Sequence, residues 1–385
     1  MPARQGGIRR GAGTDELTDV TATPRCAEAR LGDIGPGITP VSRFFVRSHL
    51  PIPVELDGPW QLEIEGEVER PYTLTREELS RAPHLSYAAV MECAGNSRDS
   101  MSPKALGVPW GHGAVGNAEW SGVPLRSLLE RAGLRPGAVE VVLEGADHGI
   151  EKGVEGEQRF SMSLPLRTAL DPRVLVADRM NGAPLTQEHG YPMRAIVPGW
   201  YGMAWVKWLR KIRLLDRPFE GYYRSKSYVY LYEGDASDVP VRPVTVQRVK
   251  SLITWPAAHA CIAPGRHTLR GIAWSGCGPI VRVEVDVGTT PAGTRPPARR
   301  EAKLGGAATP SSWTPWRCEV DLVTRGYYVL RARAADSEGN VQPDGVQWNV
   351  RGVGNNSVHE IPVLVDDPTD KPDPKAPPTR PGKGR

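Results

Sequence analysis

The sequence contains few cysteines, and their spacing matches neither a disulfide framework nor a metal cluster. Five cysteines stand at long intervals among 385 residues, and no Cys-x-x-Cys pair occurs. The number is odd, and zinc-finger and iron–sulfur spacings are absent, so the pattern argues against a disulfide-stapled or cluster-binding protein. This cysteine usage favours a reducing compartment. The five are Cys26, Cys93, Cys261, Cys277 and Cys318.

Long apolar runs are missing as well. No stretch approaches the length of a transmembrane helix, so we expect no membrane partner. Arg9 and Arg10 are followed by polar residues and not by the apolar segment of a signal peptide. These absences favour a cytoplasmic protein. A chain from which the signal peptide had been removed would show the same sequence features, so a periplasmic location stays open.

Signatures of nucleotide, haem and nucleic-acid binding are also lacking. Neither a Gly-x-Gly-x-x-Gly turn after a strand nor a phosphate-cradling Gly-Lys-Ser/Thr loop occurs, and Cys-x-x-Cys-His is absent. The formal net charge of +4 is too small to argue for a nucleic-acid partner.

The length and composition predict two domains. Phenylalanine is scarce, whereas glycine and proline are frequent, which is typical of a β-rich chain with many turns. We predict an α+β protein, with a mixed α/β domain over residues 38–240 and a disulfide-free immunoglobulin-like β-sandwich over 241–365. Residues 1–37 are expected to be a mobile N-terminal segment, and 366–385 a disordered tail.

Local signals place two helices in the first domain. Thr75 followed by Glu78 three residues later is typical of a capping box at a helix start. Residues 124–133 have the spacing of a short amphipathic helix that ends on Gly133.

Residues 91–98 combine an apolar run, a lone cysteine, a glycine and an arginine. Cys93 stands where a strand gives way to a loop, within reach of a cation that favours the thiolate. One thiolate suits a metal that is held mainly by other ligands. On spacing alone, Cys93 would more often be an ordinary small buried residue. The interpretation therefore depends on the rest of the chain.

Six short segments occur in an order typical of one enzyme family. They are residues 45–51, 93–96, 144–147, 189–194, 206–209 and 348–352. With these motifs in order, the chain resembles the sulfite oxidase family of molybdenum enzymes over residues 40–362. The resemblance implies a molybdopterin-binding domain of the sulfite-oxidase type, followed by an immunoglobulin-like domain through which the chain forms a homodimer.

The resemblance also implies the cofactor, one molybdenum and one molybdopterin per chain. Cys93 matches the single thiolate ligand of the metal. Arg194 and Lys207 offer positive charge to the pterin's phosphate, and Asp147 can accept from its amino group. Taken alone, each of these side chains would more often be structural or solvated. The positions that match cofactor-binding residues are Phe45, Arg47, His49, Cys93, Asp147, His189, Arg194, Trp205 and Lys207.

A small oxyanion is the substrate that the resemblance implies. Arg47, Arg98 and Arg351 match the guanidinium groups that bind it, and Trp110 matches a wall of the pocket. Convergent guanidiniums orient an oxyanion by forked donors. The implied reaction is oxidation of sulfite to sulfate by oxygen-atom transfer at a molybdenum-oxo centre. A cytochrome or oxygen would then take the electrons.

One position departs from the family pattern. Phe160 stands where we expect the family's active-site tyrosine, so a phenol donor should be missing unless another group, such as Tyr201, takes over. Loss of such a donor typically costs a few kcal/mol of transition-state stabilisation. Another sulfur compound or oxyanion, such as a sulfane sulfur, a sulfoxide or nitrate, therefore stays open as substrate. A non-catalytic molybdopterin carrier is a further alternative. His112 and His148 have no assigned role.

Overall fold

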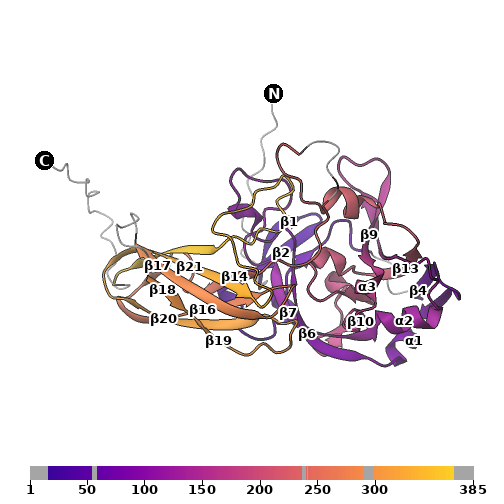
Figure 1. The fold of residues 1–385 in the computed structure, drawn as a ribbon, viewed down its shortest axis with the longest axis horizontal. Coiled ribbons are helices and arrows are strands. Elements are labelled where there is room, and N and C mark those ends of the chain that lie inside the picture. The colour runs from indigo at the N-terminus through magenta and orange to yellow at the C-terminus, as the bar shows by residue number, and fades with distance from the viewer. Residues whose placement is uncertain (1–15, 54–58, 236–239, 241, 290–297, 368–385) are drawn as a thin grey trace.

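The computed structural model describes residues 16–53, 59–235, 240, 242–289 and 298–367. Figure 1 shows a mixed domain formed by the first part of the chain and a β-sandwich formed by the second, side by side. The predicted mobile segment falls outside the described residues over 1–15, and the predicted disordered tail does so over 368–385. All five cysteines are free.

Two five-stranded sheets form the first domain. In one, with the order β5-β4-β13-β8-β9, only β13 and β4 pair in parallel. The other has the order β11-β10-β7-β6, and β12 also pairs with β10. The strands are β4 Gln61–Gly66, β5 Tyr72–Thr75, β6 Leu85–Glu92, β7 Val115–Pro124, β8 Glu140–Ile150, β9 Glu157–Pro165, β10 Leu175–Met180, β11 Ala183–Pro184, β12 Arg194–Ile196 and β13 Leu209–Leu215.

Three short α-helices and several single turns connect these strands. The capping box at Thr75 is confirmed, since Glu78 N donates to Thr75 Oγ1 at 3.2 Å and Thr75 N to Glu78 Oε2 at 2.7 Å. The predicted end at Gly133 is also confirmed, with φ at 72°. The helices are α1 Arg76–Arg81, α2 Leu125–Ala132 and α3 Leu166–Ala169; the 3₁₀ turns are η1 Leu31–Asp33, η2 Val41–Arg43, η3 Arg98–Ser100, η4 Gln187–His189 and η5 Gly202–Ala204; the π turn is η6 Tyr223–Ser227.

The second domain is a sandwich of two sheets, with the orders β14-β16-β20-β19 and β15-β22-β21-β17-β18. Small and branched residues such as Leu269, Val283 and Leu330 are fully buried between them. The α+β prediction, with a sandwich after a mixed domain, is therefore confirmed. The strands are β14 Lys250–Trp255, β15 Cys261–Ile262, β16 Gly265–Trp274, β17 Ile280–Thr289, β18 Ala298–Glu301, β19 Lys303–Leu304, β20 Thr314–Leu322, β21 Gly326–Asp336 and β22 His359–Val365.

The prediction of a mobile segment is wrong for residues 17–37. Here β1 Leu17–Ala22 and β2 Arg25–Ala29 form a hairpin, and β2 also pairs with β3 Val46–Arg47. The alternation of small apolar and polar residues in β2 buries Ala27 and Ala29. The hairpin therefore belongs to the folded body.

The two domains share an apolar contact. Val90 of β6 packs with Leu252 and Trp274 of the sandwich. A loop of the sandwich covers the free edge of β6, because Val90 N donates to Ser311 O at 2.9 Å. Cys93, which follows β6 directly, therefore lies at the junction of the domains.

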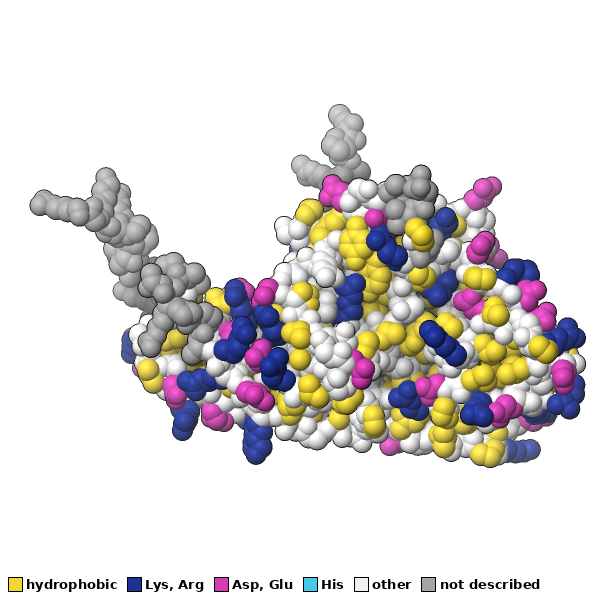
Figure 2. All heavy atoms as spheres, viewed as in Figure 1, with side chains coloured by type: hydrophobic (Ala, Val, Ile, Leu, Met, Phe, Trp, Pro, Cys, Tyr) yellow, Lys and Arg dark blue, Asp and Glu magenta, His cyan; other side chains and the backbone are white. Residues whose placement is uncertain are grey.

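Charges of both signs are distributed over the surface. On the face drawn in Figure 2, Lys and Arg side chains are interspersed with Asp and Glu over both domains. In the part of the chain that the structure describes, no helix is long and apolar enough to cross a bilayer.

The hairpin should detach when Gly113 gains a side chain. A Cβ at Gly113 would lie 1.8 Å from Ala29 O. We predict that Gly113→Ala lowers the free energy of unfolding by about 1–3 kcal/mol, the usual range for overpacking. Urea unfolding measures the loss, and limited trypsin digestion after Arg30 reports detachment. Gly137→Ala, where nothing lies within 4 Å, should change neither. A hairpin that stays protected in Gly113→Ala would contradict the prediction.

Candidate functional site

A partly open cavity lies in the first domain, beside the end of β6. All the predicted site residues line it except Arg98, Trp110 and Arg351. The lining residues are Phe44, Phe45, Arg47, Ser48, His49, Met91, Cys93, Asp147, Phe160, Glu188, His189, Arg194, Gly202, Met203, Trp205, Lys207, Trp208 and Tyr228. The topology thus brings together motifs that are more than a hundred residues apart in the chain.

Cys93 is held on the cavity wall by backbone hydrogen bonds. Its N–H donates to Ala114 O at 2.9 Å, and its carbonyl accepts from Asn96 N at 2.9 Å. Burial raises the pKa of the Cys93 thiol, and the charges of Arg47 and Arg98 oppose this shift without cancelling it. The expectation that nearby cations favour the thiolate is therefore only partly met. A bound metal would have to displace the thiol proton.

Two basic side chains line the cavity: Arg194, which is buried, and Lys207, which is half-buried. Arg194 donates to His189 O at 2.8 Å and to Trp205 O at 3.0 Å. Lys207 donates to Ser48 Oγ at 3.1 Å and to a backbone carbonyl. Burial lowers the pKa of Arg194 to about 9, because water no longer stabilises the charge. Among the described residues, neither side chain forms an ion pair. Charges in this state fit a bound anion.

Two buried polar atoms at this site lack partners within the described residues. They are Asp147 Oδ1 and Arg194 Nε. Burial raises the pKa of Asp147, although the charge of Lys207 opposes the shift. A ligand with both donors and acceptors would satisfy these atoms, which is what a pterin edge and its phosphate offer.

The donor set also fits one metal–thiolate bond. In the described ranges, no group of three or more His, Cys, Asp or Glu side chains could hold a metal ion. A metal bound at Cys93 would take its remaining ligands from a non-protein group, as a dithiolene provides. The site therefore fits the implied molybdenum–molybdopterin group.

Three predicted residues are not among those that line this cavity. Trp110 is fully buried and packs edge-on against Phe45, with ring centroids 6.4 Å apart. Arg98 donates from Nε to Gly352 O at 2.9 Å and from Nη1 to a second carbonyl. Arg351 is partly buried beside Tyr222, and its charge opposes the rise that burial produces in the pKa of that phenol.

Of the three guanidiniums expected to line one pocket, two are not among the residues that line this cavity. Only Arg47 lines the cavity, because Arg98 directs its donors to backbone carbonyls behind the Cys93 turn. The charge of Arg98 still acts on Cys93. Arg351 comes from the second domain and precedes Gly352, which accepts the hydrogen bond from Arg98.

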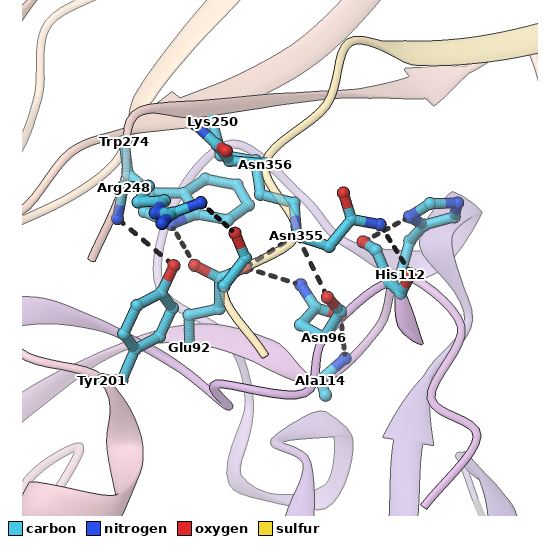
Figure 3. Close-up of polar contacts among 12 residues, drawn as sticks. Glu92, Asn96, His112, Ala114, Tyr201, Arg248, Lys250, Trp274, Asn355 and Asn356 are labelled. Carbon is cyan, nitrogen blue, oxygen red and sulfur yellow. Dashed lines mark hydrogen bonds and ion pairs between the residues drawn. The ribbon is translucent and has the colours of Figure 1, made fainter. Parts of the chain in front are cut away.

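The site contains a phenol, and it comes from a tyrosine other than Tyr201, so the alternative that another group takes over applies. Tyr228, directly after the π turn η6, lines the cavity, and its hydroxyl lies 2.5 Å from His49 Nε2. Phe160 instead stacks on the His49 ring, with centroids 4.6 Å apart. Tyr201 does not replace the phenol, since it is not among the lining residues and its hydroxyl accepts from Arg248 N at 3.3 Å (Figure 3).

The family-model comparisons agree with this geometry. Residues 49–223 match the oxidoreductase molybdopterin binding domain, and residues 242–366 match the Mo-co oxidoreductase dimerisation domain. The fold and the site thus define an oxidoreductase with a molybdenum–molybdopterin cofactor. The second match supports a homodimer.

Curated relatives agree over most of the chain. Sulfite oxidase of Gallus gallus is 34% identical over 84% of this chain and 72% of its own length. Mitochondrial sulfite oxidase of Drosophila melanogaster is 35% identical, over 85% of this chain and 59% of that protein. NADH nitrate reductase of Solanum lycopersicum is 33% identical, over 86% and 39%. The chain belongs to the sulfite oxidase family, and it spans about three fifths of the fly protein's length.

A solved structure shares the whole architecture. The sulfane dehydrogenase SoxCD from Paracoccus pantotrophus superposes with a TM-score of 0.73 and 30% sequence identity, over 87% of this chain and 83% of that one. The predicted family, enzyme class and cofactor are confirmed. Tyr228 is the site residue that the sequence analysis missed. The only signal for it was a cluster of tyrosines after the last catalytic-domain motif.

His112, which had no assigned role, lies behind the Cys93 turn. Its Nδ1 is 2.7 Å from Ser97 Oγ, and its ring packs edge-on against His359 with centroids 4.5 Å apart. Burial lowers the pKa of His112 to about 4, and the charge of Lys250 adds to the shift, while Asp99 opposes it. The ring is therefore neutral at pH 7.

Acid should destabilise the fold through this ring. Below pH 6.5 the unfolded chain binds a proton that the folded ring does not bind until about pH 4, so the free energy of unfolding falls as the pH drops through that window. We predict that His112→Gln reduces the loss between about pH 7.5 and about pH 5 by about 2 kcal/mol. Urea unfolding of the cofactor-free protein measures it. Equal losses in wild type and His112→Gln would refute the prediction.

Proposed function

We propose that this chain oxidises sulfite to sulfate and passes the electrons to an external acceptor. The observation that carries the proposal is the Cys93 thiol on the wall of a cavity that also holds Arg47, His49 and Tyr228. A guanidinium, an imidazole and a phenol beside one thiolate ligand suit a small oxyanion. The similarity to sulfite oxidases supports this choice of substrate.

Each side of the cavity has a different task in holding the cofactor. Cys93 would ligate the metal, Arg194 and Lys207 would bind the phosphate, and Asp147 would accept from the pterin's amino group. When bound, the cofactor supplies oxygen-atom transfer and takes up two electrons. Phe45 and Trp205 close the apolar part of the wall and exclude water.

His49 and Tyr228 orient the oxyanion together. Burial lowers the pKa of His49 well below its ordinary value, and Arg47 and Lys207 add to the shift, so the ring is neutral. Burial raises the pKa of Tyr228, so the phenol keeps its proton. If His49 Nε2–H donates to the Tyr228 oxygen, the phenol proton is free to donate to the oxyanion, with the guanidinium of Arg47 supplying charge.

A sulfane sulfur compound is the second candidate substrate, because the sulfane dehydrogenase SoxCD shares the fold at 30% identity. The argument from Phe160 no longer supports an altered substrate, since Tyr228 supplies a phenol. A cytochrome or oxygen remains the proposed acceptor. We further propose that residues 242–366 form the homodimer contact.

Replacing the ligand should abolish turnover. We predict that the purified protein contains one molybdenum per chain and reduces ferricyanide when sulfite is added. Cys93→Ser should lose this turnover completely, because the metal–thiolate bond is lost. Elemental analysis and the ferricyanide assay measure both. Cys261→Ser, at an exposed thiol in the sandwich, should behave as wild type. Molybdenum-loaded protein that reduces ferricyanide with a sulfane compound but not with sulfite would overturn the proposal that sulfite is the substrate.

The two buried tyrosines should respond differently to loss of their hydroxyls. Tyr228→Phe should lower kcat/KM for sulfite by about 100-fold, the usual effect of removing one donor to developing charge. Tyr201→Phe removes an equally buried hydroxyl that lies outside the cavity, so its kcat/KM should stay within about twofold of wild type. Steady-state kinetics over a range of sulfite concentrations decide the matter. Equal effects of the two substitutions would disprove the role of Tyr228.

A further inference from the structure

A buried ion pair lies directly beside Cys93. Glu92 is the last residue of β6, and Lys250 is the first residue of β14 in the other domain. Lys250 Nζ is 2.8 Å from Glu92 Oε1, and each side chain is only 2% exposed. Trp274 Nε1 donates to the second carboxylate oxygen at 3.0 Å. Figure 3 shows these groups meeting where the two domains touch.

The pair also contacts the turn that follows Cys93. Asn96 Nδ2 donates to Glu92 Oε1 at 3.1 Å, and Lys250 Nζ lies 3.5 Å from Asn96 O. Asn96 Oδ1 in turn accepts from Ala114 N at 3.2 Å. Residues on both sides of Cys93 are therefore held by one network.

A second segment of the sandwich domain holds the same turn. Gly354 N donates to Ala94 O at 2.7 Å, and Asn355 Nδ2 donates to Ser97 O at 2.9 Å. This segment follows directly on Gly352, which accepts the hydrogen bond from Arg98. The second domain thus contacts the Cys93 turn on both sides.

Stability alone does not explain a pair of this kind. Burying two charges costs desolvation, and apolar residues of similar volume commonly stabilise a fold as well or better. A charged, hydrogen-bonded pair does provide a defined geometry, because each atom has a required partner. Supporting hydrogen bonds of this kind orient metal ligands in other metal sites.

We propose that Glu92 and Lys250 are positioning residues for Cys93, through which the second domain sets the geometry of the metal-ligand turn. The inference rests on the proposed function, because it takes Cys93 as the ligand. It goes beyond the proposed function, because it assigns the sandwich domain a role in positioning Cys93 as well as in the dimer contact.

Hydrogen exchange in the cofactor-free protein tests the proposal without any turnover. Glu92→Gln and Lys250→Met each leave a buried group unpaired, so both should lower global stability. The double variant carries no unpaired charge and should regain most of that stability. In all three variants, the amides of residues 94–98 should exchange at least about tenfold faster than in wild type.

The double variant decides the outcome. Amides 94–98 that exchange as slowly as in wild type, in a stable double variant, would overturn the proposal, because the pair would then only compensate its own charges. Asp336→Asn is the matched control. Asp336 is also a buried carboxylate, but it accepts from Ser275 and Asn340 within the sandwich. Its loss should lower stability and leave residues 94–98 protected.

The molybdenum-loaded enzyme provides a second test of the proposal. The double variant should keep the KM for sulfite within about twofold and lose about 10- to 100-fold in kcat, as supporting-residue changes do in metal sites. Its molybdenum(V) electron paramagnetic resonance signal should shift, because the thiolate sits differently. An unchanged signal and kcat would overturn the proposal. If wild type lacked molybdenum, the proposed function would fail, while the exchange result would still show whether the pair orders the turn.

Discussion

Hydrogen bonds from both domains hold the backbone of the Cys93 turn. Ala114 and Asn96 bind the cysteine's own peptide groups from within the first domain, and Gly354 N reaches Ala94 O from the second. A thiolate ligand has to lie at one distance and one angle from its metal. A disordered turn would lose conformational entropy when it adopted that position. The ordered turn supplies that geometry in advance.

The charged and polar groups that line the cavity also call for a bound ligand. Arg194 is buried and Lys207 is half-buried, and neither forms an ion pair among the described residues. Asp147 Oδ1 and Arg194 Nε have no hydrogen-bond partner there. Burial of unpaired charge is unfavourable, so the fold around the cavity is completed by an anion with donor groups. Cofactor binding and stability of the first domain are therefore linked, since a ligand that binds only the folded state stabilises it.

Local signals and long-range packing explain what the sequence could and could not predict. The capping box at Thr75 and the end at Gly133 depend on neighbours within a few residues, so both were predictable. Cys93 was identified by its place among ordered motifs. The hairpin of residues 17–29 was missed, because its burial depends on pairing with β3, which follows β2 at a distance. Tyr228 was missed for the same reason: its neighbour His49 lies 179 residues away.

Arg98 matches a substrate-binding position of the family, but its side chain supports the backbone of both domains. A Cβ on Gly95, Gly107 or Gly352 would lie within 3 Å of its side chain, so three glycines leave room for it. Both described hydrogen bonds of its side chain go to backbone carbonyls, one in each domain. Its positive charge nevertheless acts on Cys93, and burial makes that charge effective because little water screens it. One guanidinium thereby joins the domains and adds to the positive potential at Cys93.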